Sequence, residues 1–196
     1  VSKITPDGTS TIFATTGQYP YAITLGNSGT IYTSNVGDRT VSKITPDGTS
    51  TILGTTGPNS YGITIDSVGN IYTTSINDNA VSKITPDGTS TVFATTGANP
   101  YGITIDSVGN IYTANHGDNT VSKITPDGTS TILGTTGINP YDLVIDRNGN
   151  LYTSNIGDNT VSKITPDGTS TVFASTGPSP YNITIDGSGN LYTANA

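Results

Sequence analysis

The chain has 196 residues, a formal net charge of −7 and no cysteine. Its 14 acidic residues are all aspartate, and five of its seven basic residues are lysines that recur at one position of a repeat. The lack of cysteine excludes disulfides and cysteine-ligated zinc. Scattered basic residues do not form the clustered positive surface that nucleic acids require. No apolar run approaches the ~20 residues of a membrane-spanning helix. We therefore expect no nucleic-acid partner and no membrane insertion.

The rest of the composition is polar but weakly charged. Charged residues make up 11% of the chain, whereas threonine, serine, asparagine and glycine abound. This balance resembles that of bacterial repeat proteins that are secreted or held at the cell surface, which is the location we expect. The chain begins at Val1 without a visible signal peptide, so we interpret it as a trimmed or excised segment.

An internal repeat organises the whole sequence. The eleven residues VSKITPDGTST recur unchanged with a period of 40, beginning at Val1, Val41, Val81, Val121 and Val161. The period divides the chain into five units of one predicted domain, at 1–40, 41–80, 81–120, 121–160 and 161–196. Such a period is typical of propeller blades and of some two-helix repeats. Eleven identical residues in five copies favour recent amplification or deliberate design.

The residues within each unit predict strands rather than helices. Proline and several glycines interrupt every unit, while valine, isoleucine, threonine and tyrosine favour pleated strands. In the third unit we expect strands at 81–85, 90–95, 101–106 and 111–115. The turn at Pro86-Asp87-Gly88 has the residues that a tight reversal requires. Four short antiparallel strands in 40 residues correspond to one propeller blade.

Ten residues of this unit carry a family resemblance. The unit resembles a blade of the NHL-repeat propellers at Pro100, Gly102, Ile103, Asp106, Gly109, Asn110, Ile111, Tyr112, Asp87 and Gly88. It is also similar to the propeller blades of streptogramin (virginiamycin B) lyases, through its ITPDG and PYGIT segments. The lyase resemblance implies a catalytic histidine with a glutamate and a bound magnesium ion. This chain has no glutamate and a single histidine, His116.

The resemblance also implies the order of strands within a blade. The strand beginning at Tyr101 would be innermost, followed outward by those at 111–115, 81–85 and 90–95 of the repeat. The chain would then begin with two outer strands and end with two inner ones. We therefore predict an all-β, five-bladed propeller with four antiparallel strands per blade. Its ring would be closed as a monomer by a 2+2 blade shared between the two termini.

The strand directions divide the loops between two faces. The crossovers between blades (17–20, 57–60, 97–100, 137–140 and 177–180) share one face with the loops at 35–40, 75–80, 115–120 and 155–160. We call this the crossover face, and the opposite one, with the TPDG and Asp-x-x-Gly-Asn turns, the turn face. Differences between units concentrate on the crossover face. We therefore predict a ligand site there, at Tyr19, Arg39, Asn59, Asn77, His116, Asp118 and Asp158, although exposed loops also vary without function.

Simpler interpretations of these residues remain open. His116 stands where sister units have Val36 and Ile156, as expected of an ordinary loop residue. The aspartates of the Gly-Asp-Asn loops match no calcium-binding spacing and are expected to cap their own turns.

With one histidine and neither glutamate nor cysteine, the sequence predicts no catalytic residue, metal or cofactor. We therefore expect a non-catalytic scaffold that binds an unidentified protein or carbohydrate, or a repeat with no dedicated ligand. The alternative is a streptogramin lyase-like or lactonase-like propeller enzyme.

Overall fold

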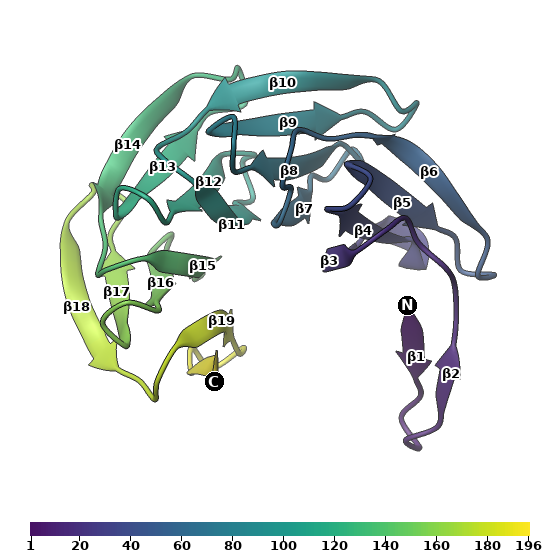
Figure 1. Ribbon diagram of the computed structural model, residues 1–196. Coiled ribbons are helices and arrows are strands. Elements are labelled where there is room, and N and C mark those ends of the chain that lie inside the picture. The colour runs from purple at the N-terminus through teal and green to yellow at the C-terminus, as the bar shows by residue number, and fades with distance from the viewer.

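The computed structural model describes all 196 residues, and they form four complete blades and two half-blades (Figure 1). Each complete blade is an antiparallel sheet whose strands follow one another from the central axis outward. Their bounds are β3 Pro20–Leu25, β4 Ile31–Asn35, β5 Thr40–Ile44 and β6 Ser50–Thr55; β7 Ile63–Ile65, β8 Ile71–Ser75, β9 Ala80–Ile84 and β10 Ser90–Thr95; β11 Pro100–Ile105, β12 Ile111–Asn115, β13 Thr120–Ile124 and β14 Ser130–Thr135; β15 Pro140–Ile145, β16 Leu151–Asn155, β17 Thr160–Ile164 and β18 Ser170–Ser175.

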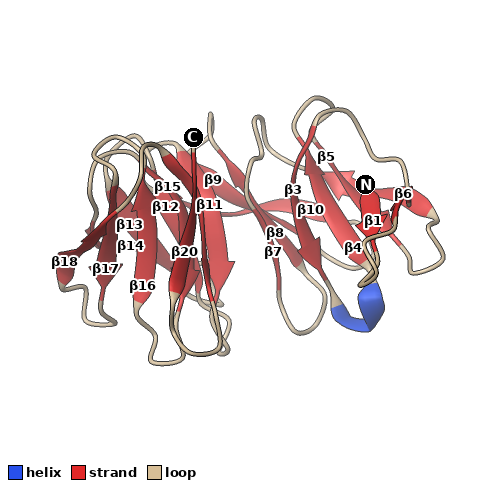
Figure 2. Cartoon of the chain, turned by 90° about the horizontal axis from the view of Figure 1, so that it is seen from below, coloured by secondary structure: helices blue, strands red, loops and turns tan.

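The half-blades lie at the two ends of the chain. β1 (Ser2–Ile4) and β2 (Ser10–Ile12) form one two-stranded sheet, and β19 (Pro180–Ile185) and β20 (Leu191–Asn195) form the other. The only helix is η1, a single turn at Asn27–Gly29 on the turn face, which is much too short to cross a membrane (Figure 2). The predicted all-β propeller architecture and the order of strands within a blade are confirmed.

The repeated turns are stabilised by their own side chains. In the TPDG turn of the third unit, Asp87 accepts hydrogen bonds from the Thr85 hydroxyl and, at 3.1 Å, from the Thr89 backbone amide. These hydrogen bonds lower the pKa of the exposed Asp87 carboxyl, that of Thr85 contributing most. Gly88 has a φ of +89°, a conformation that glycine adopts without a steric penalty. Each TPDG segment therefore fixes the register of the two outer strands.

The hydrophobic core lies between neighbouring blades rather than within one blade. One cluster combines Tyr72, Val81 and Ala94 of one sheet with Ile103, Ile111 and Ile124 of the next. The two middle sheets are covered on both faces in this way, so apolar residues occur on both sides of their strands. In the inner strand of the first complete sheet, by contrast, Ile23 and Leu25 are 58% and 68% exposed. The half-blades lack such cover on the face turned toward the gap: Ile4 is 71% exposed, whereas its equivalents Ile44, Ile84, Ile124 and Ile164 are fully buried. The other face of the C-terminal half-blade is covered, because Ile183 packs with Tyr152 and Val161 of the neighbouring blade.

A polar network is buried alongside this core. Asn115 is inaccessible to solvent, donates to Thr120 and Ser122 and accepts a 2.8 Å hydrogen bond from Thr113. The second unit has Ser75 in place of the asparagine, and the buried Thr73 hydroxyl there has no hydrogen-bond partner. One substitution between units therefore leaves an unsatisfied buried group, which is costly in an apolar environment.

The predicted closure of the ring is not found. β1 and β20 belong to separate two-stranded sheets, and Figure 1 shows β1 across a gap in the arc from β19 and the C-terminus. The physical reason is that interlocking side chains fix the angle between neighbouring blades, so the number of units alone does not decide whether the ends meet. The molecule is an open arc with one unpaired sheet edge at each end.

Candidate functional site

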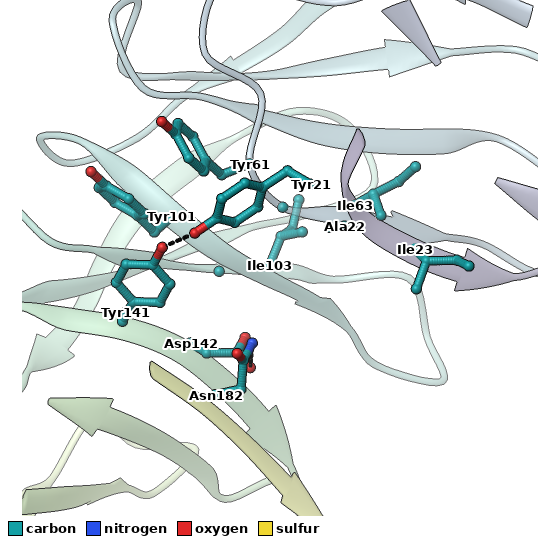
Figure 3. A pocket seen from close by; sticks show the side chains of 12 residues that line it. Tyr21, Ala22, Ile23, Tyr61, Ile63, Tyr101, Ile103, Tyr141, Asp142 and Asn182 are labelled. Atoms are coloured by element: carbon teal, nitrogen blue, oxygen red, sulfur yellow. Dashed lines mark hydrogen bonds between the residues drawn. The ribbon is translucent and has the colours of Figure 1, made fainter. Parts of the chain in front are cut away.

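Tyrosines gather where the inner strands face the central axis. Each unit has the tyrosine of a Pro-Tyr or Ser-Tyr pair in its inner strand or, for Tyr61, two residues before it, and Figure 3 shows four of these side chains together. Neighbouring rings have centroids 4.3 to 5.2 Å apart and are inclined by 36° to 77°, in the order Tyr21, Tyr61, Tyr101 and Tyr141. The hydroxyls of Tyr21 and Tyr141 are hydrogen-bonded to each other across the cluster. Four units thus build one aromatic wall.

Beside this wall lies a pocket of about 420 Å³. Its other lining residues are Ala22, Ile23, Gly62, Ile63, Gly102, Ile103, Asp142 and Asn182. The glycines are needed because the inner strands approach closely at the axis. A Cβ atom on Gly62 would lie 2.5 Å from the carbonyl oxygen of Tyr101, and one on Gly102 would lie 2.7 Å from the Cα atom of Asp142. A concave site lined by aromatic and aliphatic side chains together with a few polar groups is typical of small-molecule pockets.

Asp142 supplies the only carboxylate of the pocket lining. Its oxygens accept hydrogen bonds from the backbone amides of Leu143 (2.9 Å) and Ile183 (3.2 Å), and a longer one from the Asn182 side chain (3.5 Å). Burial raises the pKa of the Asp142 carboxyl, and these hydrogen bonds oppose part of the rise. A carboxyl group with a raised pKa in a cleft is a candidate for binding or proton transfer.

The sequence interpretation missed this residue, although the repeat contains the signal. The position after the axial tyrosine is Ala22, Gly62, Gly102, Asp142 and Asn182 in the five units. Comparison of the units at this position would have identified one carboxylate and one amide among small residues. The predicted site lay in the loops, whereas these two polar residues lie within predicted strands.

His116 lies at the rim of the aromatic cluster. Its ring packs against Tyr101 with centroids 4.9 Å apart, and its backbone amide donates to the Asn99 carbonyl at 3.0 Å. Burial lowers the pKa of the imidazole, so the neutral form is favoured at neutral pH. Of the seven predicted site residues, His116 is the one whose side chain contacts the axial tyrosines.

The other variable residues lie further out on the crossover face. Tyr19 and Arg39 are exposed, and both have positive φ angles, of 51° and 56°. Asn59 donates a 3.1 Å hydrogen bond to Asn77, which joins a crossover to the adjacent loop. None of these four residues lines the axial pocket.

The two predicted aspartates hold loops in place. Asp118 accepts hydrogen bonds from the Ala98 amide (2.8 Å) and the Thr120 hydroxyl (2.7 Å). Asp158 accepts equivalent ones from Ile138 (3.0 Å) and Thr160 (2.8 Å). Each carboxylate thus ties the crossover that enters a blade to that blade's own loop, in agreement with the turn-capping alternative.

The chain offers no set of side chains suited to a metal centre. No three His, Cys, Asp or Glu side chains gather closely enough to hold an ion. Asp142 is surrounded by backbone amides and an asparagine, all of which donate hydrogen bonds to it. The residues present therefore do not fit the magnesium ion that the lyase resemblance implies.

Comparison with known proteins identifies the family. The model of the Virginiamycin B lyase family matches residues 1–196, so the chain belongs to this family. A virginiamycin B lyase from Staphylococcus aureus superimposes with a TM-score of 0.80 at 25% identity, over 91% of this chain and 64% of that one. Its catalytically inactive H270A form, solved with quinupristin, gives 0.86 at 24% identity, over 99% and 70%. No curated protein matches the sequence.

Two further solved structures are similar in fold but are not lyases by name. A propeller of the Nidogen/Laminin complex has a TM-score of 0.79 at 20% identity, over 91% of this chain and 73% of that one. A gluconolactonase from Xanthomonas campestris gives 0.75 at 15% identity, over 99% and 75%. These two likenesses establish the NHL-type propeller fold alone.

These findings correct the functional prediction. The expectation of a non-catalytic binding scaffold, and of a protein that is not an enzyme, is wrong, because the family and its solved members are lyases. The enzyme-like alternative is the better supported. This chain spans 64% of the length of the first lyase, so it corresponds to part of such a propeller.

Proposed function

We propose that the chain forms the substrate-binding part of a lyase that acts on compounds of the streptogramin B type in the axial pocket. The observation that carries this proposal is the lyase family match along the whole chain. The pocket is consistent with it, since it combines an aromatic wall with one carboxylate at the centre of the arc.

The chemistry of an elimination assigns roles to the residues present. A base removes a proton from carbon, the freed electron pair forms a double bond, and the leaving group departs with its bonding electrons. Asp142 is the base in this proposal, because burial raises its pKa toward the working pH, which favours proton transfer. The hydroxyls of Tyr21 and Tyr141, which face one another at the axis, can donate hydrogen bonds to the leaving group.

His116 is a second candidate base at the rim. The inactive lyase carries a histidine-to-alanine change in its name, and His116 is the single histidine of this chain. Its lowered pKa keeps the imidazole able to accept a proton at neutral pH. Substrates large enough to reach from Asp142 past Tyr101 would contact it.

Product analysis tests this function. The chain is incubated with quinupristin, and the products are followed by mass spectrometry. A lyase adds no water, so the products together have the mass of the substrate, whereas hydrolysis of the lactonase type makes them heavier by one water. Asp142→Asn should lower turnover by about 10²-fold or more.

Matched variants complete the test. Asp127→Asn removes a carboxylate from an exposed TPDG turn and should leave turnover unchanged. His116→Ala separates the two candidate bases. Absence of any turnover, or full activity in Asp142→Asn, would contradict the proposal as stated.

The predicted location and partners remain proposals. Secretion or attachment at the cell surface is a proposal that rests on composition alone. A protein partner is compatible with the likeness to the Nidogen/Laminin complex, whereas a glycan partner remains a proposal from the sequence alone.

A further inference from the structure

We propose that the axial pocket selects ligands that carry an organic cation, with an alkylated ammonium group beside Asp142 and against the tyrosine rings. This inference rests on the proposed function only in that it names the ligand class of the same pocket. It is argued from the charges around the pocket, the surroundings of Asp142 and the geometry of the tyrosine rings.

The charge distribution favours a positive ligand. The pocket lining contains one carboxylate and no lysine or arginine. The repeated lysines lie on the outer strands, away from the pocket. The Nζ atom of Lys83 lies 5.6 Å from the ring centroid of Phe93, and the Nζ atom of Lys123 lies 6.0 Å from that of Tyr112. The whole chain also carries a net charge of −7. An anionic ligand would thus meet an unfavourable potential at the axis.

Asp142 has no cationic partner within the protein. Its hydrogen bonds come from two backbone amides and one amide side chain, all of them neutral. A half-buried carboxylate pays a desolvation cost that neutral donors offset only in part. Gly102 of the neighbouring strand packs closely against Asp142, and a Cβ atom on it would lie 2.8 Å from Oδ1. A ligand therefore reaches the carboxyl only from the pocket, whose lining Asp142 shares with Tyr141 and Asn182. A ligand cation placed there would compensate the charge.

The tyrosines determine the kind of cation. Rings inclined to one another present both faces and edges to the pocket, and cations bind aromatic faces within about 6 Å of the ring centre. An alkylated ammonium group is weakly hydrated and suits such a site. A metal ion requires several oxygen or nitrogen ligands, and the chain offers no cluster of this kind.

A matched pair of probes tests the inference without catalysis. Choline and its neutral analogue 3,3-dimethyl-1-butanol have the same shape and differ in charge. Binding is followed by ligand-observed NMR, and independently by tyrosine fluorescence, because the chain contains no tryptophan. Choline should bind about tenfold more tightly or better. Equal binding of the two probes would overturn the inference.

Variants locate the site. Asp142→Asn keeps the side-chain size and should weaken choline binding about tenfold, with little effect on the neutral probe. Asp142→Gly, which copies Gly62 and Gly102 of the sister units, should do the same. Asp127→Asn on the turn face should change nothing. Unchanged choline binding in both Asp142 variants would also overturn the inference.

The outcome is distinguishable from that of the proposed function. Choline is not a substrate, so its binding does not depend on turnover. Turnover of quinupristin without choline selectivity would refute the cation preference and retain the lyase. Choline selectivity without turnover would retain the cation site and refute the lyase.

Discussion

Identical isoleucines in different units allow the open arc to be tested by measurement. Ile84 is fully buried in a cluster with Tyr32, Val41, Ile63 and Ile71, whereas the equivalent Ile4 is 71% exposed. Ile84→Ala removes a buried side chain and leaves a cavity, which costs about 2–5 kcal/mol. Ile4 has less than a third of its surface buried, so Ile4→Ala should cost less than about 1 kcal/mol.

Urea unfolding followed by tyrosine fluorescence measures both costs on the same chain. Light scattering at the same concentration confirms that each sample is monomeric, because self-association would also bury Ile4. Ile124→Ala serves as a second buried reference. If Ile4→Ala proves as destabilising as Ile84→Ala in a monomer, the N-terminal strand is covered, and the ring is closed rather than open.

Three further predictions concern single features of the structure. Ser75→Asn should raise the free energy of unfolding in urea by about 1 kcal/mol, because it gives the buried Thr73 hydroxyl the acceptor found in other units. An unchanged free energy of unfolding would contradict the role of this buried network. Asp142→Asn should raise Tm at pH 7, because the raised pKa of Asp142 in the folded state means that its ionised form destabilises the fold. This increase in Tm should shrink as the pH falls below the folded-state pKa of Asp142. An increase in Tm that is independent of pH would refute the raised pKa. Cysteines at Ser2 and Thr193, which would face each other in a closed 2+2 blade, should form no intramolecular disulfide, as checked by the mobility of the oxidised monomer.

Local chemistry explains why the strands were predictable. The third unit forms strands at Ala80–Ile84, Ser90–Thr95, Pro100–Ile105 and Ile111–Asn115, each within one residue of the expected bounds. Proline, aspartate and glycine fix the turns, and β-branched residues fill the strands between them. These signals act over a few residues and are read directly from the sequence.

Long-range geometry explains what was missed. Whether β1 meets β20 depends on the packing angle between blades, which no single unit encodes. The axial pocket arises from residues 40 positions apart that meet only at the axis. Variation between the loops led to the prediction of Asp118 and Asp158 as site residues. In the structure their carboxylates accept hydrogen bonds from the backbone amides of the crossovers.

In each repeat the residues that stabilise the blade differ from the residues that line the pocket. The pocket lining can therefore vary while the blades stay nearly identical. The invariant VSKIT and TPDG segments supply the outer strands, their turns and much of the inter-blade core. No further strand lies between the inner strand of each blade and the axis. The residue after each tyrosine therefore lines the pocket directly. The difference between Gly102 and Asp142 changes the charge of the site, but it is not tolerated in every blade, because a Cβ atom on Gly102 would lie 2.7 Å from the Cα atom of Asp142. A propeller built from copied units can therefore acquire a directional site where the spacing between inner strands admits a side chain, as at Asp142, with the aromatic wall supplied by the repeated tyrosines of that blade and its neighbours.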